Sequence, residues 1–336
     1  MKHFLRRPTG LLLLSITLAA CGVVDALSGD QTVRVYSGRH YDLEEAFEQY
    51  AEASGVDVEF LFGGDAELRE RLSTEGVDTL ADVFMTVDAA NLELAASEDL
   101  LQPMAGTAID LIPENLVHPD GLWTGLSKRV RTIMYHPDRV DPSKLSTYED
   151  LADPKWKGRV CMRNSNNVYT QSLVASLIHH HGYEAALEVV SGWVQNETEI
   201  MSNDIVILET IAAGGCDVGI TNHYYLARLL EEDPEFPVLA FWANQDDRGV
   251  HVNVSGAGVT ANADNPDLAT DLIDWLATDG QEAFVYGNHE YPVNPDVEPP
   301  PLVRGWGEFK EDPLNASVFA ALNTDAIRLM NEAGYD

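Results

Sequence analysis

The alternation of short β-type segments with amphipathic helical segments constrains the fold of this chain more than any other feature. Segment 33–36 is β-type, and segment 42–54 repeats apolar side chains on one helical face before Gly55. A second pair follows, with alternating apolar residues over 56–60 and a helical pattern over 65–74. This order predicts an α/β protein with a mostly parallel sheet and helices on both faces.

The same pattern continues through the rest of the chain. Further strands are expected at 82–86, 159–162 and 217–221, and further helices at 168–179 and 225–231. We interpret two extended stretches, 126–135 and 251–260, as crossovers between two lobes. A helix-and-strand pattern resumes at 267–276 and 282–286, and the proline-rich tail is helical near 319–333.

The length of the chain also predicts two lobes, because a single core rarely extends over roughly 315 residues. We expect the first lobe to comprise 31–128 together with 255–295, and the second to comprise 129–254. Residues 296–336 form a C-terminal helical tail that the sequence assigns to neither lobe.

The N-terminus has the character of a secretory signal. Basic residues precede an apolar run over 11–20 that is too short to span a bilayer comfortably. The run ends in Leu18-Ala19-Ala20-Cys21, which resembles a bacterial lipoprotein cleavage box. We therefore expect a signal peptide over 1–20, a lipid on Cys21, a linker over 21–30, and a location in the periplasm or at the cell surface. The alternative is an ordinary signal peptide followed by a chance cysteine.

Charge excludes one class of function. The chain has 55 acidic residues against 21 basic ones and a net charge of −34, so phosphate backbones are repelled and nucleic-acid binding is not expected. Such acidity resembles the surfaces of proteins from salt-loving organisms, where salt screens the self-repulsion. The alternative is simply an acidic, solvated surface.

Two cysteines remain after the expected cleavage, Cys161 and Cys216. In an oxidising compartment they can pair, which would tie together two segments that each precede a tyrosine discussed below. Two buried free thiols are the other reading, and the sequence leaves both open.

Four tyrosines and one histidine occupy equivalent places, each just after an expected strand. These residues are His40, Tyr41, Tyr169, Tyr224 and Tyr225. In open α/β sheets, ligands bind in the crevice beyond the carboxyl ends of the strands, and all five side chains are expected there. A single tyrosine at a strand end is usually a core or rim residue. The prediction of a ligand site rests on three separate strand–loop–helix junctions that each carry such residues.

The chemistry of phenolate oxygen indicates which ligand such a cluster suits. It is hard and anionic and so matches a hard, highly charged cation, with ferric ion as the natural candidate. Four phenolates and an imidazole around Fe(III) leave one negative charge, which Arg39 is placed to offset unless it holds a small anion such as carbonate. Arg129 or Arg131, on the expected crossover, either neutralises phenolate charge or forms a structural salt bridge.

Other motifs carry less weight. Gly287-Asn288-His289-Glu290 matches a metallophosphatase fragment, but the Asp/His clusters that such chemistry needs are not found, so we interpret it as a chance match. His179 to His181 are adjacent on a helix and point in different directions, which favours a solvated helix end. No nucleophile elbow, P-loop or dinucleotide-binding fingerprint is present, and we do not expect an enzyme.

The chain resembles the bacterial periplasmic ferric-ion-binding proteins of ABC iron importers. The resemblance is carried by the segments 36–41, 81–86, 166–173 and 221–229, of which the last contains the paired tyrosines. It implies a two-lobed type II periplasmic binding fold with a ligand cleft between the lobes, an inner-membrane ABC permease as partner, and a monomer.

The family divides by the ligands of the first lobe. One branch uses a glutamate at the position of Val87, which cannot ligate, and another uses Arg-His-Tyr with an extra tyrosine in the second lobe. The sequence resembles the second, tyrosine-rich branch, which implies Fe(III) held by His40, Tyr41, Tyr169 and the tyrosine pair. The alternative is the same fold binding an oxyanion, a polyamine or an organic cation.

Overall fold

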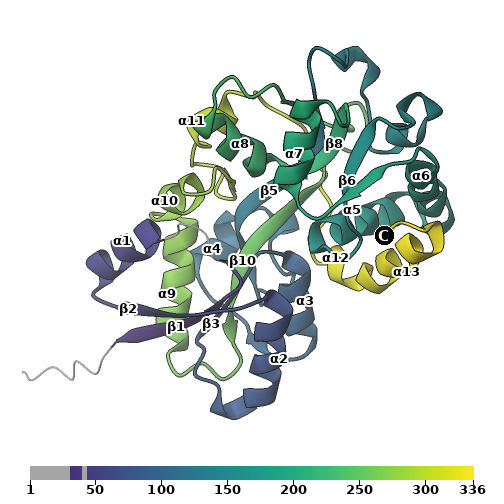
Figure 1. The fold of residues 1–336 in the computed structure, drawn as a ribbon. Coiled ribbons are helices and arrows are strands. Elements are labelled where there is room, and N and C mark those ends of the chain that lie inside the picture. The colour runs from purple at the N-terminus through teal and green to yellow at the C-terminus, as the bar shows by residue number, and fades with distance from the viewer. Residues whose placement is uncertain (1–30, 40–43) are drawn as a thin grey trace, which may run out of the picture.

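The computed structural model describes residues 31–39 and 44–336 (Figure 1). The expected signal peptide, Cys21 and the linker lie outside these residues, as do His40 and Tyr41. Within the described ranges, no helix has the length and apolar character needed to cross a membrane.

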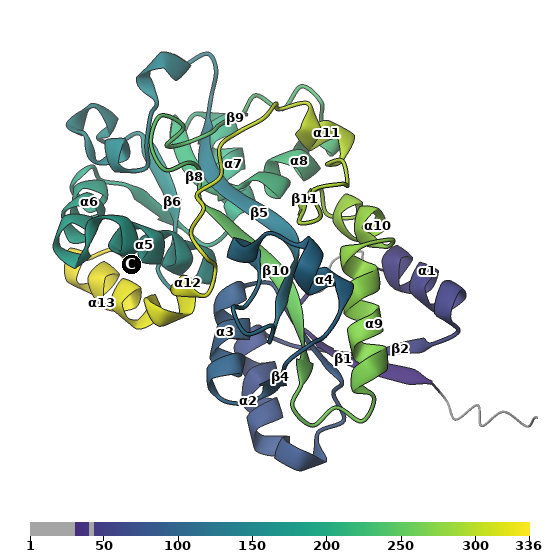
Figure 2. The same ribbon diagram turned by 180° about the vertical axis from the view of Figure 1, so that it is seen from behind.

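The first half of the sheet has a parallel core. Strands β1 (Thr32–Ser37), β2 (Asp57–Phe62) and β3 (Val83–Thr86) pair in parallel, with β1 in the middle. The connecting helices are α1 (Glu44–Ser54), α2 (Asp65–Glu75) and α3 (Ala89–Ser97). Figures 1 and 2 show α2 and α3 on one side of these strands, and α1 with α9 (Pro266–Ala277) on the other. The predicted α/β order is confirmed in this half.

Two long antiparallel strands connect this half to the second one. β5 (Thr124–Tyr135) and β10 (Val252–Thr260) pair with each other, while β10 also pairs with β3 and β5 also pairs with β8 (Val218–Asn222). The strand order along the sheet is β2-β1-β3-β10-β5-β8-β6-β7. Both extended stretches expected from the sequence are therefore strands that run between the two halves.

The second half repeats the strand–helix order. Its remaining strands are β6 (Val160–Arg163), β7 (Glu199–Met201) and β9 (Leu239–Phe241), and its helices are α5 (Val168–His181), α6 (Tyr183–Gln195), α7 (Asp204–Ala213) and α8 (His223–Glu232). Shorter elements are β4 (Leu101–Gln102), α4 (Thr107–Leu111), β11 (Tyr291–Pro292) and 3-10 turns at Gly76–Asp78, Glu114–Leu116, Pro142–Lys144, Glu149–Ala152 and Pro154–Trp156.

The structure differs from the sequence prediction at two places, whereas the helical tail expected near 319–333 is confirmed. Helix α8 begins at His223 rather than at 225, so Tyr224 and Tyr225 lie inside its first turn. The segment after α9 is a helix, α10 (Gln281–Tyr286), so helix follows helix there. The tail forms α11 (Pro301–Arg304), α12 (Val318–Ala321) and α13 (Asn323–Ala333). Helix α13 packs on α5 and α6, whereas α12 contacts both α3 and α5 (Figure 2).

Cys161 and Cys216 form a disulfide, which decides between the two readings of the sequence. Cys161 lies in β6 and Cys216 just before β8, and both are buried beside Ile207 and Ile211 of α7. The bridge therefore joins the two segments that lead to Tyr169 and to the tyrosine pair.

Removing this bridge should destabilise the protein without removing any predicted ligand. Because the bridge spans 55 residues, replacing both cysteines by alanine should cost about 2–4 kcal/mol of unfolding free energy. Urea denaturation of the double variant, compared with the parent under oxidising conditions, measures this. Equal midpoints would show that the bridge contributes nothing to stability.

Candidate metal centre

Two helix starts place three of the predicted tyrosines. Tyr169 is the second residue of α5, where the side chain of the N-cap Asn167 accepts a hydrogen bond from the Tyr169 backbone N–H at 3.0 Å. Tyr224 and Tyr225 lie in the first turn of α8, directly after β8. Both sites lie beyond the carboxyl ends of strands and at positive helix termini, where an anion is favoured.

The structure brings these three side chains together. The Tyr224 hydroxyl donates to the Tyr169 hydroxyl oxygen at 3.3 Å, and the ring centroids of Tyr224 and Tyr225 are 4.4 Å apart. Tyr224 is fully buried, Tyr169 is nearly so, and Tyr225 is partly exposed. Their role as metal ligands stays a prediction, as does that of His40 and Tyr41, which lie outside the described residues.

A buried polar chain reaches the Tyr224 oxygen from the second half of the sheet. Asn222 Nδ2 donates to the Tyr224 hydroxyl oxygen at 3.2 Å, and Arg131 Nη1 donates to Asn222 Oδ1 at 3.2 Å. Arg131 is in turn paired with Asp204 at 3.0 Å. A donor aimed at a phenol oxygen favours the phenolate form, so these hydrogen bonds favour an anionic Tyr224.

Positive charge surrounds the tyrosine rings. The Arg129 guanidinium carbon lies 4.9 Å from the Tyr169 ring centroid, and that of Arg228 lies 5.4 Å from the Tyr224 ring centroid. Burial alone would lower the pKa of Arg129, but the Tyr169 and Tyr224 oxygens, with the carboxylates of Asp88 and Glu290, raise it above the usual arginine value. Both crossover arginines form buried salt bridges, Arg129 with Asp88 at 3.9 Å and Arg131 with Asp204 at 3.0 Å. Arg129 also lies against the Tyr169 ring, and neutralisation of phenolate charge by either arginine stays a prediction.

Arg39 is paired with a residue that the sequence did not single out as a site residue. Its Nη1 lies 2.9 Å from Glu290 Oε2, both side chains are fully buried, and Ser127 Oγ lies 3.0 Å from the same nitrogen. Burial acts to raise the pKa of Glu290, but Arg39 and Arg129 hold it below the usual glutamate value. The charge of Arg39 is therefore met by Glu290, while its predicted part in balancing phenolate charge or holding an anion stays a prediction.

The sequence also did not indicate a role for a second carboxylate, that of Asp65, which lies against Gly38 after β1. The half-buried Asp65 accepts from the backbone N–H of Val87 at 3.1 Å, and a side chain at Gly38 would overlap its carboxylate. Burial and the nearby Asp88 raise the pKa of Asp65 to about 7. Val87, at the position where the resemblance implies a glutamate ligand in the other branch, thus contributes a backbone N–H donor in this chain.

The three adjacent histidines at the end of α5 do not converge. His180 Nε2 lies 2.8 Å from Asp312 Oδ2, and His181 Nε2 lies 2.8 Å from Glu149 Oε1. All three histidines are exposed to solvent, as expected from sequence, and two of them also have acidic partners. Across the described part of the chain, no group of three or more His, Cys, Asp or Glu is arranged to hold a metal.

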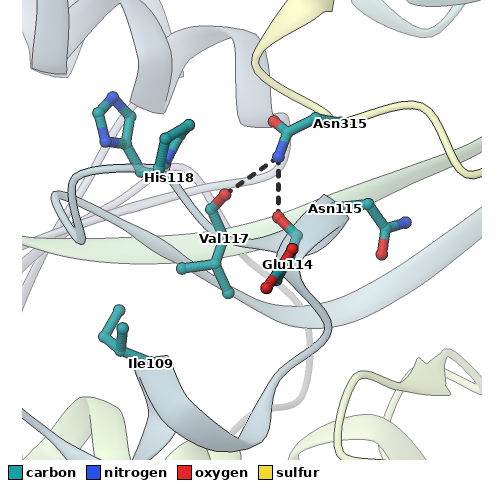
Figure 3. A pocket seen from close by; sticks show the side chains of 7 residues that line it. Ile109, Glu114, Asn115, Val117, His118 and Asn315 are labelled. Carbon is teal, nitrogen blue, oxygen red and sulfur yellow. Dashed lines mark hydrogen bonds between the residues drawn. The ribbon is translucent and has the colours of Figure 1, made fainter.

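A cavity of about 220 Å³ lies between the two halves, next to Tyr169. It is lined by Arg69 and Asp88 from the first half and by Val168 and Ser172, which flank Tyr169 on α5. A larger hollow of about 520 Å³ lies between residues 109–119 and Asn315, whose side chain donates to the carbonyls of Glu114 and Val117 (Figure 3). Of the predicted ligands that the structure describes, Tyr169, Tyr224 and Tyr225, none lines that larger hollow.

Comparison with known proteins places the chain in a family. Residues 78–304 match the model of the bacterial extracellular solute-binding proteins. The chain is 40% identical to Iron uptake protein A1 of Synechocystis over 95% of its length and 93% of that protein. It is 28% identical to the Fe(3+)-binding periplasmic protein of Serratia marcescens, over 97% of both chains.

Solved structures agree with this placement. The Trichodesmium IdiA (FutA) protein, solved in complex with iron and citrate ligands, superposes with a TM-score of 0.87 at 42% identity, covering 91% of this chain and all of that one. The Campylobacter jejuni ferric binding protein superposes with a TM-score of 0.84 at 31% identity, over 90% of this chain and all of that one. The predicted two-lobed architecture is confirmed by these neighbours. The chain belongs to the bacterial extracellular solute-binding protein family and has the type II periplasmic binding fold.

Proposed function

We propose that this protein binds ferric ion outside the cytoplasm as the substrate-binding component of an ABC importer and delivers it to an inner-membrane permease. The observation that carries the proposal is the meeting of Tyr169, Tyr224 and Tyr225 at two helix starts, with the phenol oxygens of Tyr224 and Tyr169 3.3 Å apart. The names of the relatives, which are iron-uptake and Fe(3+)-binding proteins, support the same substrate. The role is binding and delivery rather than catalysis.

The ligand set in this proposal is Tyr169, Tyr224 and Tyr225 together with Tyr41 and His40 of the first lobe. A free phenol has a pKa near 10, so Fe(III) must displace a proton from each tyrosine that it binds. The Asn222 donor, the two helix N-termini and the arginines over the rings all favour the anionic form. The surrounding residues thus lower the cost of making several phenolates in one place.

The remaining parts of the proposal concern placement and partners. We propose lobe boundaries at 31–128 with 255–295 and at 129–254, and the packing of α13 on α5 and α6 supports assigning the end of the tail to the second lobe. The anchor is a lipid on Cys21 and the working state is a monomer. Carbonate or another small anion completes the iron coordination where the protein ligands leave a position open.

The direct test is the colour of the purified protein with iron. Adding one equivalent of Fe(III) should produce a visible tyrosinate-to-iron charge-transfer band that saturates at one ion per protein. A protein that stays colourless and retains no Fe(III) after desalting would refute the proposal. Calorimetry of the metal-free protein with oxyanions, polyamines and organic cations would then test the alternative ligands.

Acidification should release the iron. Protons compete with Fe(III) for the phenolate oxygens, because binding displaces phenol protons. The apparent Fe(III) affinity should therefore fall as pH falls. Each tenfold rise in proton concentration should weaken binding by more than tenfold if more than one proton is displaced. The absorbance of the charge-transfer band, titrated from neutral to acidic pH, measures this. An apparent Fe(III) affinity that does not change with pH would show that binding displaces no phenol proton.

A further inference from the structure

The turn Gly287–Glu290 lies between α10 and β11 and faces α8 (Figure 2). From sequence we interpreted its resemblance to a metallophosphatase fragment as a chance match. His289 adopts a left-handed backbone conformation with φ of 52°. Such a conformation is uncommon outside glycine, and it persists where surrounding contacts fix it, frequently at functional sites. The contacts of this turn show what fixes it.

One side of the turn holds the first-half segment that leads to His40 and Tyr41. Glu290 accepts from Arg39 Nη1 at 2.9 Å, and Ser127 Oγ donates to the same carboxylate. The Arg39 guanidinium also lies over the Phe284 ring, with its carbon 4.7 Å from the ring centroid. Glu290 therefore holds the side chain of Arg39, the last residue of the described segment 31–39.

The other side of the turn holds α8. Asn288 Oδ1 accepts from Arg228, whose guanidinium carbon lies 5.4 Å and 5.8 Å from the ring centroids of Tyr224 and Tyr225. The His289 carbonyl accepts from His223 Nε2 at 2.9 Å, one residue before the tyrosine pair. These contacts set the position of the first turn of α8 relative to the turn.

The hydrogen bond between Asn288 and Glu290 joins the two sides. Asn288 Nδ2 donates to Glu290 Oε1 at 2.7 Å, which completes a continuous chain Arg39–Glu290–Asn288–Arg228. We propose that Asn288 and Glu290 are positioning residues that hold Arg39, at the end of the described segment 31–39, in register with Tyr224 and Tyr225 of α8. This inference rests on the proposed ferric site. Groups that orient metal ligands affect affinity because a pre-arranged site loses less freedom on binding.

Two variants test the two sides separately. Asn288→Ala removes the contact to Arg228 and the link to Glu290, and leaves the Arg39–Glu290 pair in place. Glu290→Gln keeps the shape of the side chain and removes the charge opposite Arg39. Each should lower Fe(III) affinity by roughly 10- to 100-fold in a chelator-competition titration and should shift the charge-transfer band. The matched control is Glu149→Gln, which removes a carboxylate paired with Arg248 on another part of the second half.

The outcomes separate a positioning role from a merely structural one. Lower affinity with a shifted band in Asn288→Ala, alongside parental affinity and an unshifted band in Glu149→Gln, supports the proposal. Parental affinity and an unshifted band in Asn288→Ala would overturn it, even if Glu290→Gln fails to fold. If the parent protein itself binds no Fe(III), the proposed function fails instead, which is a distinguishable result.

Discussion

Replacing Tyr224 by phenylalanine should weaken Fe(III) binding by at least about a hundredfold, equivalent to roughly 3 kcal/mol. The ring is fully buried and will keep its place, so the change removes the oxygen alone. In the proposed site that loss deletes one anionic ligand, and it also leaves the Asn222 Nδ2 donor without its Tyr224 acceptor. Chelator competition gives the affinity, and the intensity of the charge-transfer band reports the loss of one phenolate.

The matched control for this variant is Tyr50→Phe. Tyr50 is a buried tyrosine in α1 whose hydroxyl donates a hydrogen bond to the Leu268 carbonyl, and it lies in no segment that carries predicted ligands. It should bind Fe(III) like the parent. If Tyr224→Phe and Tyr50→Phe have the same affinity and the same band, Tyr224 is not a ligand.

Periodicity made the α/β order and the strand-end position of the tyrosines predictable. Side chains at the carboxyl ends of strands in an open α/β sheet project into one crevice, so Tyr169 and Tyr224 were both expected there. Their spacing alone did not predict that the two side chains meet. The start of α8 was missed although Asn222, a favourable capping residue, occupies the N-cap position. The Asn222 side chain makes no capping hydrogen bond and donates to the Tyr224 hydroxyl oxygen instead. Capping preferences therefore indicate where α8 begins, but not that Asn222 contacts Tyr224.

Contacts between residues that are far apart in the chain could not be predicted from the sequence. Arg39 and Glu290 are separated by 251 residues, and no local pattern indicates that one buried charge meets the other. The sequence fragment Gly287–Glu290 resembles a metallophosphatase motif. In the structure, its side chains instead contact Arg39, which follows β1, and Arg228 of α8. The choice between a disulfide and two thiols at Cys161 and Cys216 likewise depends on the distance between β6 and the start of β8.

The buried ion pair beneath the site should contribute strongly to its rigidity, and removing one partner should be severely destabilising. Asp204 is fully buried and Arg131 nearly so, with 3.0 Å between Oδ2 and Nη1. Asp204→Asn should cost about 3–5 kcal/mol of unfolding free energy, because it leaves the Arg131 charge buried and unpaired. For a chain of this size that corresponds to a fall in Tm of roughly 5–8 °C, measurable by calorimetry.

Two comparisons show whether the loss reflects an unpaired charge. Glu59→Gln breaks an exposed pair with Arg34 and should cost less than about 1 kcal/mol. The double variant Arg131→Met with Asp204→Leu removes both charges, so its destabilisation should be well below the sum of the two single changes. Additive losses in the double variant would show that volume and hydrogen bonding, rather than the isolated charge, set the cost. Since Arg131 also holds Asn222 against Tyr224, the double variant should weaken Fe(III) binding even where stability is restored.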